Sequence, residues 1–205
     1  MTVPAWIEEL EPAAADIVAA WRGIDEGQFL SVRREVRRRS GEGTAARTVQ
    51  QLAATASALR AVVDALPETA FALPGGEGDW NVAEAVGHVA SARAGLVLAA
   101  SLAAADRWPV DAPTVVPGVP GPPAASRDQL VAKLDQSQRL IERRAALIAG
   151  HEVDPCPLDH PLVGRLRCGE WLLFAGVHDL MHLEQLHGIA AALHAADPAP
   201  ASRFA

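Results

Sequence analysis

The sequence lacks tyrosine entirely, has only four phenylalanines among 205 residues, and contains few runs of β-branched residues. These are the residues that strands favour, so their scarcity argues against an extensive β-sheet. Half of the residues are hydrophobic, and most of these are alanine, leucine and valine, which favours helices. We therefore expect an all-α protein, with a length that suits one domain and a core that needs no disulfide bonds.

Lysine is nearly absent, since Lys133 is the only one, and the acidic residues give a formal net charge of −7. This charge argues against a constitutive nucleic-acid-binding protein, because contacts to phosphate need a positive surface. The exception is the segment 31–39, which holds five arginines. We interpret it as the solvated face of a short helix, and we expect no nucleic-acid partner.

Long hydrophobic runs are also missing. The longest apolar tracts, such as residues 94–105, are short and interrupted by polar residues, so we expect no transmembrane helix and no membrane partner. Residues 8–11 include three glutamates where a signal peptide would have a basic and then an apolar region, which predicts a cytoplasmic protein. In a reducing cytoplasm the two cysteines, Cys156 and Cys168, are expected to be free structural thiols.

Apolar residues recur at spacings of three and four, the period of an amphipathic helix, in four segments. Two of these segments begin with the spacing of a capping box, Asn81 with Glu84 and Ser126 with Gln129. Four amphipathic helices bury their apolar faces most simply as a four-helix bundle. The predicted helices span about residues 48–65, 81–100, 126–150 and 169–194.

The segment 106–123, between the second and third predicted helices, is too rich in proline to be helical. About twenty extended residues reach on the order of 60 Å, whereas a helix of about 24 residues is only about 36 Å long. The segment can therefore cross the whole bundle, and the second and third helices are expected to be parallel.

The sequence divides into an N-terminal helical extension (1–45), the four-helix bundle (46–197) and a tail (198–205). The extension has weak helical patterns at residues 5–10 and 13–21. It offers apolar contacts either to a second copy of the chain, in a homodimer, or to its own bundle. These contacts are the side chains of Trp6, Trp21, Phe29 and Leu30.

Two histidines of the fourth predicted helix, His178 and His182, are four residues apart and so project from one face. They interrupt the apolar stripe of that helix, which predicts that both point inward. Burying two imidazoles is costly unless their nitrogen atoms are satisfied, and one shared cation satisfies both acceptors. We therefore favour a metal site over a pair of core histidines bonded to polar neighbours.

Such a site needs a third ligand, and the remaining five histidines are the candidates. His88 is favoured, because it lies within another predicted helix among small residues that leave room for a site. Two others lie in the proline-containing loop before the fourth helix, and two lie off the face of the histidine pair or near the end of that helix. The candidates are His88, His151, His160, His187 and His194.

Two known metal motifs fit poorly. A zincin needs His-Glu-x-x-His with the glutamate as general base, but here Asp179 follows His178 and its side chain is shorter. Di-iron carboxylate bundles need two Glu-x-x-His pairs, and only Glu184 with His187 has that spacing.

The segment Asp79–Val89, with tryptophan, a capping residue and a histidine in this order, resembles the second-helix motif of the DinB/YfiT-like metal-binding bundles. The segment Asp159–Gly164 followed by Trp171–Gln185 resembles the closing half of the same family. The combination of both motifs is more specific than either alone.

This resemblance covers about residues 46–195 and implies a four-helix bundle with a long crossover between helices two and three. It also implies that three histidines, His88, His178 and His182, hold zinc, nickel or a similar divalent ion. The first 45 residues have no counterpart in the resemblance.

Three histidines leave an open coordination position, which is typical of catalytic sites and at which water or a thiol could bind. The resemblance implies the same options, because relatives include transferases that use low-molecular-weight bacterial thiols, and proposed hydrolases. We favour a metal-dependent thiol transferase with a small-molecule substrate, which predicts a cavity at the ion. A hydrolase predicts an acidic residue near the ion, and a non-catalytic helical protein with a structural or vestigial metal predicts a fourth ligand or a sealed site.

Two further polar residues have open roles at this stage. Glu84 could orient the imidazole of His88, or it could act only in the capping box with Asn81. Gln185 could lie near the ion or be a polar residue of the bundle core.

Overall fold

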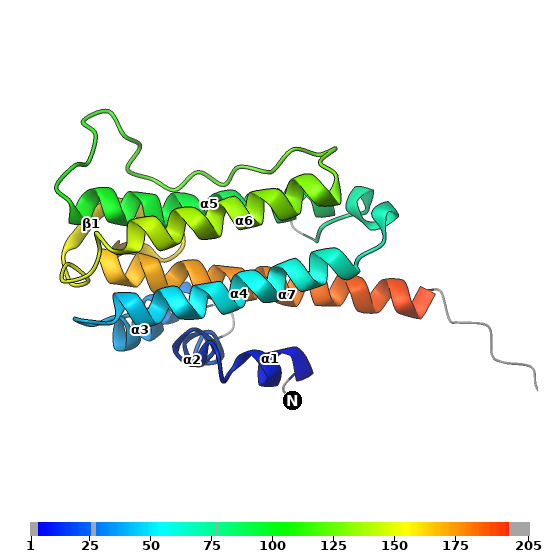
Figure 1. Ribbon diagram of the computed structural model, residues 1–205, viewed down its shortest axis with the longest axis horizontal. Coiled ribbons are helices and arrows are strands. Elements are labelled where there is room, and N and C mark those ends of the chain that lie inside the picture. The colour runs from blue at the N-terminus through cyan, green and yellow to red at the C-terminus, as the bar shows by residue number, and fades with distance from the viewer. Residues whose placement is uncertain (1–3, 26–27, 77, 197–205) are drawn as a thin grey trace, which may run out of the picture.

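A computed structural model describes residues 4–25, 28–76 and 78–196 and confirms the mostly helical class (Figure 1). The predicted tail, 198–205, lies outside the described residues. The elements in chain order are α1 (Ala5–Leu10), α2 (Ala15–Arg22), α3 (Phe29–Arg39), α4 (Ala45–Ala65), the short 3-10 helix η1 (Glu68–Ala72), α5 (Val82–Ala104), α6 (Arg127–Ala145), β1 (Pro155–His160), β2 (Gly164–Arg167) and α7 (Cys168–Ala196).

The four long helices lie side by side, and α4 and α5 each pack against both α6 and α7. Both predicted capping boxes are present. The side chains of Asn81 and Ser126 each accept a hydrogen bond from the third backbone N–H of their helix, and the side chains of Glu84 and Gln129 accept one from the backbone N–H of Asn81 and Ser126. The segment 105–126, here called the crossover, runs back along the length of α5, so that α5 and α6 point the same way (Figure 1).

The prediction for α6 was too long at its C-terminus. The helix ends at Ala145, and the chain then turns through residues 146–150, the last of which is Gly150 with a φ of +82°. Ile148 remains fully buried, which explains why the apolar pattern continues past the end of the helix.

The strands β1 and β2 were not predicted. They form an antiparallel hairpin in the segment that the sequence indicated as a loop before the fourth helix, and Gly164 adopts a φ of +73° at its turn. The strands are short and only Cys156, Leu158 and Leu166 are buried along them, so no period of two stood out in the sequence. The fold is therefore mostly helical with one small hairpin.

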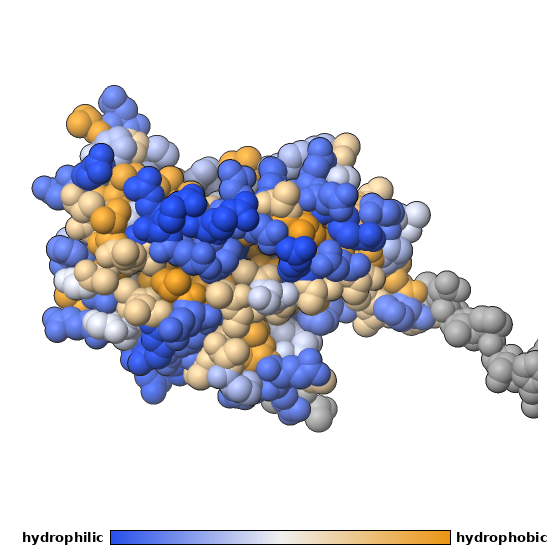
Figure 2. Space-filling model, in the orientation of Figure 1, coloured by the Kyte–Doolittle hydropathy of each residue, from blue (hydrophilic) through white to orange (hydrophobic). Residues whose placement is uncertain are grey.

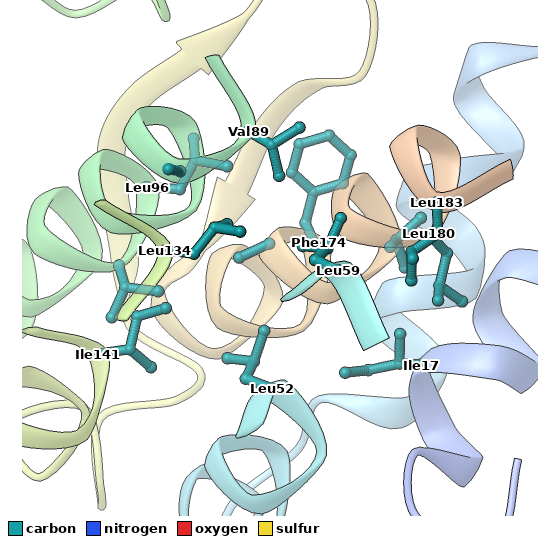
Figure 3. Packing of buried hydrophobic residues seen from close by; sticks show 14 of the residues in the cluster. Ile17, Leu52, Leu59, Val89, Leu96, Leu134, Ile141, Phe174, Leu180 and Leu183 are labelled. Carbon is teal, nitrogen blue, oxygen red and sulfur yellow. The ribbon is translucent and has the colours of Figure 1, made fainter. Parts of the chain in front are cut away.

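The core between the helices is built from aliphatic side chains, which Figure 3 shows pointing toward one another from α2, α4, α5, α6 and α7. An ion pair lies within this core. Arg93 of α5 and Asp179 of α7 are both fully buried, with Nε of Arg93 3.1 Å from Oδ2 of Asp179. Arg93 also donates to Ser137 of α6 and to the backbone oxygen of Leu52 of α4, so this one guanidinium connects all four long helices.

The N-terminal extension packs on its own chain, with α2 and α3 against α7 and α1 and α2 against α4. Gln51 of α4 accepts hydrogen bonds from the backbone N–H groups of Asp16 and Ile17, in the first turn of α2, at 2.9 and 3.1 Å. A side chain at Gly176 of α7 would collide with Ile17, so this glycine permits the close approach of α2. Trp6 and Trp21 pack against the core, whereas Phe29 and Leu30 are exposed.

The arginines of α3 mostly pair with carboxylates. Glu35, which is 2 % exposed, accepts from Arg34 and Arg39, and Glu170, which is 1 % exposed, accepts from Arg37. Part of the basic segment therefore binds the chain itself. On the face that Figure 2 shows, hydrophilic side chains gather over α6.

By length and composition, α5 is long and apolar enough to cross a membrane, which corrects the expectation that no segment reaches that length. More than half of its most apolar window, 56 %, is buried inside the protein. The central helix of a packed helical protein meets the same two criteria, so the finding carries little weight for membrane insertion.

Candidate metal centre

The structure brings together the three histidines that the sequence singled out. His88 lies near the start of α5, and His178 and His182 lie one turn apart in α7. One ring nitrogen from each lies within 4.8 Å of the other two, and this is the only group of metal-ligand side chains found in the described part of the chain. The ring centroids are 4.6 to 5.4 Å apart.

Hydrogen bonds fix the orientation of two of these rings. His88 Nδ1 lies 2.9 Å from the carbonyl oxygen of Val119, and His182 Nδ1 lies 2.7 Å from Oε1 of Gln185. Because both partners can only accept, each Nδ1 carries the proton and each Nε2 offers a lone pair. Gln185 is held in turn by donating to the carbonyl oxygen of Gly75. Such hydrogen bonds behind the ligating atoms are typical of metal-binding histidines.

The third ring, that of His178, is placed by packing. Its Nδ1 is buried and has no hydrogen-bond partner among the described residues, while its Nε2 lies 3.3 Å from Nε2 of His88. Two nitrogen ligands of one tetrahedral zinc ion, at bonds of about 2.0–2.1 Å, are separated by about 3.3 Å. The distance between the two Nε2 atoms therefore fits a shared ion.

The electrostatic surroundings keep His178 neutral. Burial lowers the pKa of His178 well below its ordinary value, and the neighbouring His182 and His88 lower it further. A neutral imidazole retains the lone pair that a metal ligand needs. The Trp80 ring lies 4.9 Å from that of His88 and Phe174 lies 6.3 Å from His178, so aromatic side chains border the cluster.

The crossover positions His88 through a close approach of two glycines. A Cβ atom at Gly87 would lie 2.8 Å from Cα of Gly121, and a Cβ at Gly121 would lie 2.6 Å from Cα of Gly87. This contact brings the carbonyl oxygen of Val119 onto His88 Nδ1. The alternative role of Glu84 is wrong, because its carboxylate binds the backbone N–H of Asn81 in the capping box.

A cavity of about 510 Å³, here called the metal cavity, adjoins all three histidines. Its walls come from α3, from α5 and the segment before it, from the crossover, from the β1–β2 hairpin and from α7. No aspartate or glutamate is among the described residues that line it. The main polar side chains of the lining are those of His88, His160, His178, His182 and Gln185.

His160 also lines the cavity, although the sequence favoured His88 over it as the third ligand. It ends β1, and its Nδ1 accepts hydrogen bonds from the backbone N–H groups of Leu162 and Val163, at 3.1 and 3.4 Å. Its proton therefore resides on Nε2. The ring packs edge-on against Phe174, and burial lowers the pKa of His160. His160 belongs to the motif Asp159–Gly164, which was the sequence signal that could have identified it. The hairpin that places His160 at the cavity was not predicted.

The other candidate residues lie elsewhere. His151 pairs with Asp154 at 2.7 Å, His187 stacks on Trp6, and the His194 ring contacts its own helix. Asp179 follows His178 in sequence, but its carboxylate faces the core and binds Arg93 and Thr55. The structure thus supports the rejection of a zincin base, since Asp179 is committed to the ion pair.

The fold and the site define a mostly helical protein with a three-histidine cluster that could hold a metal ion. Residues 51–186 match the model of the DinB superfamily, and the chain belongs to that family. No curated protein and no solved structure matches the chain.

Proposed function

We propose that α4, α5, α6 and α7 form the metal-binding four-helix bundle of this DinB superfamily protein, with His88, His178 and His182 as ligands of one divalent ion. Imidazole ligands suit zinc, nickel, copper and iron alike, and we propose zinc or nickel because the family resemblance implies these ions. We further propose that the protein is a cytoplasmic, metal-dependent transferase that uses a low-molecular-weight thiol to modify a small-molecule substrate.

The metal cavity is the observation that carries this proposal. A divalent ion held by three histidines would deprotonate a thiol at its open position, so the reaction needs no protein carboxylate as base. The cavity of about 510 Å³ offers room for a thiol cofactor beside the cluster, and no carboxylate is among its described lining residues. A purely structural site, with a fourth ligand or a sealed surface, is less compatible with this arrangement.

Residues around the site orient the histidines, border the cluster and line the cavity. Val119 and Gln185 hold two imidazoles in the ligating tautomer, and the rings of Trp80 and Phe174 border the cluster. His160 lines the cavity with its Nε2–H as a donor, because its Nδ1 is used by backbone N–H groups. It is suited to bind an oxygen atom of a substrate.

Hydrolysis is the second candidate, and the observation that favours it is the same His160. An imidazole in the cavity could accept a proton from water, since no carboxylate is among the described lining residues. The backbone N–H groups that bind its Nδ1 oppose this role, because they hold the ring in one tautomer and the proton on Nε2.

Metal content measured by mass spectrometry on protein without a His-tag tests the site. We expect about one equivalent in the wild type and none in the His178→Ala/His182→Ala variant. The matched control is His151→Ala/His194→Ala, which removes two exposed histidines away from the cluster and should retain the metal. A variant of the predicted ligands that still binds one equivalent would contradict the assignment.

Thiol binding is tested on the cobalt(II)-substituted protein. We expect N-acetylcysteine to produce a saturable near-ultraviolet thiolate-to-cobalt charge-transfer band, and N-acetylserine, the matched alcohol, to produce none. Absence of this band in protein that holds cobalt would refute the transferase proposal and favour hydrolysis.

A further inference from the structure

A second cleft, of about 350 Å³, lies between α5 and the crossover, and we call it the crossover cleft. Among the described residues of its lining, polar side-chain atoms come from His88, Ser91 and the indole of Trp108. The cleft meets the metal cavity at residues that line both, namely His88, Ala92, Leu96, Val116 and Pro117. The crossover cleft and the metal cavity are therefore neighbours that share His88, one of the three clustered histidines, in their walls.

Backbone hydrogen bonds hold the roof of the crossover cleft in place. Val116 N–H donates to the carbonyl oxygen of Asp159 at 2.9 Å, and Asp159 N–H donates to that of Thr114 at 2.7 Å. Further along, Gly121 N–H donates to the carbonyl oxygen of Glu84 at 2.9 Å. The crossover is thus joined to β1 at one point and to α5 at another, so the cleft is formed before any ligand binds.

The floor of the cleft is left open by small residues of α5. A Cβ atom added at Gly95 would have no atom of the described residues within 4 Å, whereas one at Gly87, two turns earlier, would collide with Gly121. The crossover therefore closes on α5 beside His88 and stands away from it at Gly95. A volume of about 350 Å³ lies in the range of small-molecule sites, and its lining suits an apolar group.

We propose that the crossover cleft binds the alkyl chain of the electrophilic substrate, while the thiol occupies the metal cavity. This inference rests on the proposed function and specifies its substrate class: a molecule with an apolar alkyl chain and an electrophilic carbon at one end. The thiolate sulfur forms a bond to that carbon, and the bond from carbon to the leaving group breaks. The leaving group departs with the electron pair and takes up the proton that the thiol released, so no oxidant or reductant is needed.

Calorimetric binding of unbranched alcohols from butanol to octanol tests the cleft without using the metal. We expect affinity to rise about fourfold for each added methylene group until the cleft is filled. Gly95→Leu places a side chain in the cleft, also favours the helix, and should abolish this dependence. Gly188→Leu, at an exposed position of α7 with equal space, is the matched control and should retain it. Affinities that do not depend on chain length, or the same dependence in Gly95→Leu, would overturn the proposal.

A second measurement asks whether both ligands bind at once. With saturating octanol present, the charge-transfer band of N-acetylcysteine on the cobalt protein should persist, and loss of the band to octanol would overturn the two-site arrangement. If no band forms even without octanol, the proposed thiol transfer fails, and the calorimetric series alone decides whether the cleft binds alkyl chains. The two failures are therefore distinguishable.

Discussion

The buried ion pair between Arg93 and Asp179 should be the most sensitive point of the fold. Asp179→Asn preserves the shape of the side chain but leaves the guanidinium of Arg93 without a counter-charge at a site that is fully buried. Removing one partner of a buried pair costs about 3–5 kcal/mol of the free energy of unfolding. For a chain of this length that corresponds to a Tm lower by about 6–20 °C.

The same reasoning predicts that removing both charges is far less damaging. Burial raises the pKa of Asp179, against the opposing effects of Arg93 and Thr55, so the ionised carboxylate pays a large desolvation cost. Replacing both partners with apolar residues of similar size is often neutral or stabilising. We expect Arg93→Met/Asp179→Leu to recover most of the stability that Asp179→Asn loses.

Urea unfolding followed by tryptophan fluorescence and circular dichroism measures these differences. The matched control is Asp135→Asn, which breaks the exposed pair with Arg60, whose side chains are 39 % and 48 % exposed. Exposed pairs contribute at most about 1 kcal/mol, so this variant should unfold close to the wild type. A cost for Asp179→Asn no larger than for Asp135→Asn would refute the argument from burial.

Three further outcomes follow from the site. Gly121→Ala should weaken metal binding about 10–100-fold, because the added methyl group collides with Gly87 and displaces the Val119 carbonyl that orients His88. A competition titration with a chromophoric chelator measures the metal affinity, and an affinity equal to that of the wild type would contradict this prediction. The metal-free protein should lose stability as pH falls below about 6.5, by up to about 1.4 kcal/mol per pH unit. The reason is that the pKa of His178 is lowered in the native state, so that the unfolded chain takes up the proton first; a flat urea midpoint between pH 7.5 and 5.5 would argue against it. Removing the ion from loaded protein with a chelator should lower Tm by about 5–10 °C if free metal had been about 100-fold above Kd, and equal melting curves would exclude a tightly bound native-state ion.

Local sequence patterns were sufficient to predict where two of the long helices begin and that two of the clustered histidines share a helix face. The capping boxes at Asn81 and Ser126 depend on residues three apart, and both form as predicted. The spacing of His178 and His182 depends only on the helical repeat, so their common face was predictable as well. The prediction of His88 as the third histidine of the cluster depended on a hypothesis about which helices pack together, and the family resemblance supported it. The structure brings the His88 ring to the other two.

Contacts between distant segments were decided only by the tertiary structure. The Val119 carbonyl lies 31 residues from His88 in the chain, and no sequence pattern shows which backbone oxygen a folded proline-rich segment will present. The hairpin that brings His160 to the cavity is too short to give a clear periodicity. In the sequence, Arg93 is the one arginine of an apolar helix, and Asp179 is a neighbour of a predicted ligand. Their pairing became visible only when α5 and α7 were packed together, because burial, and not sequence spacing, requires each charge to find its partner.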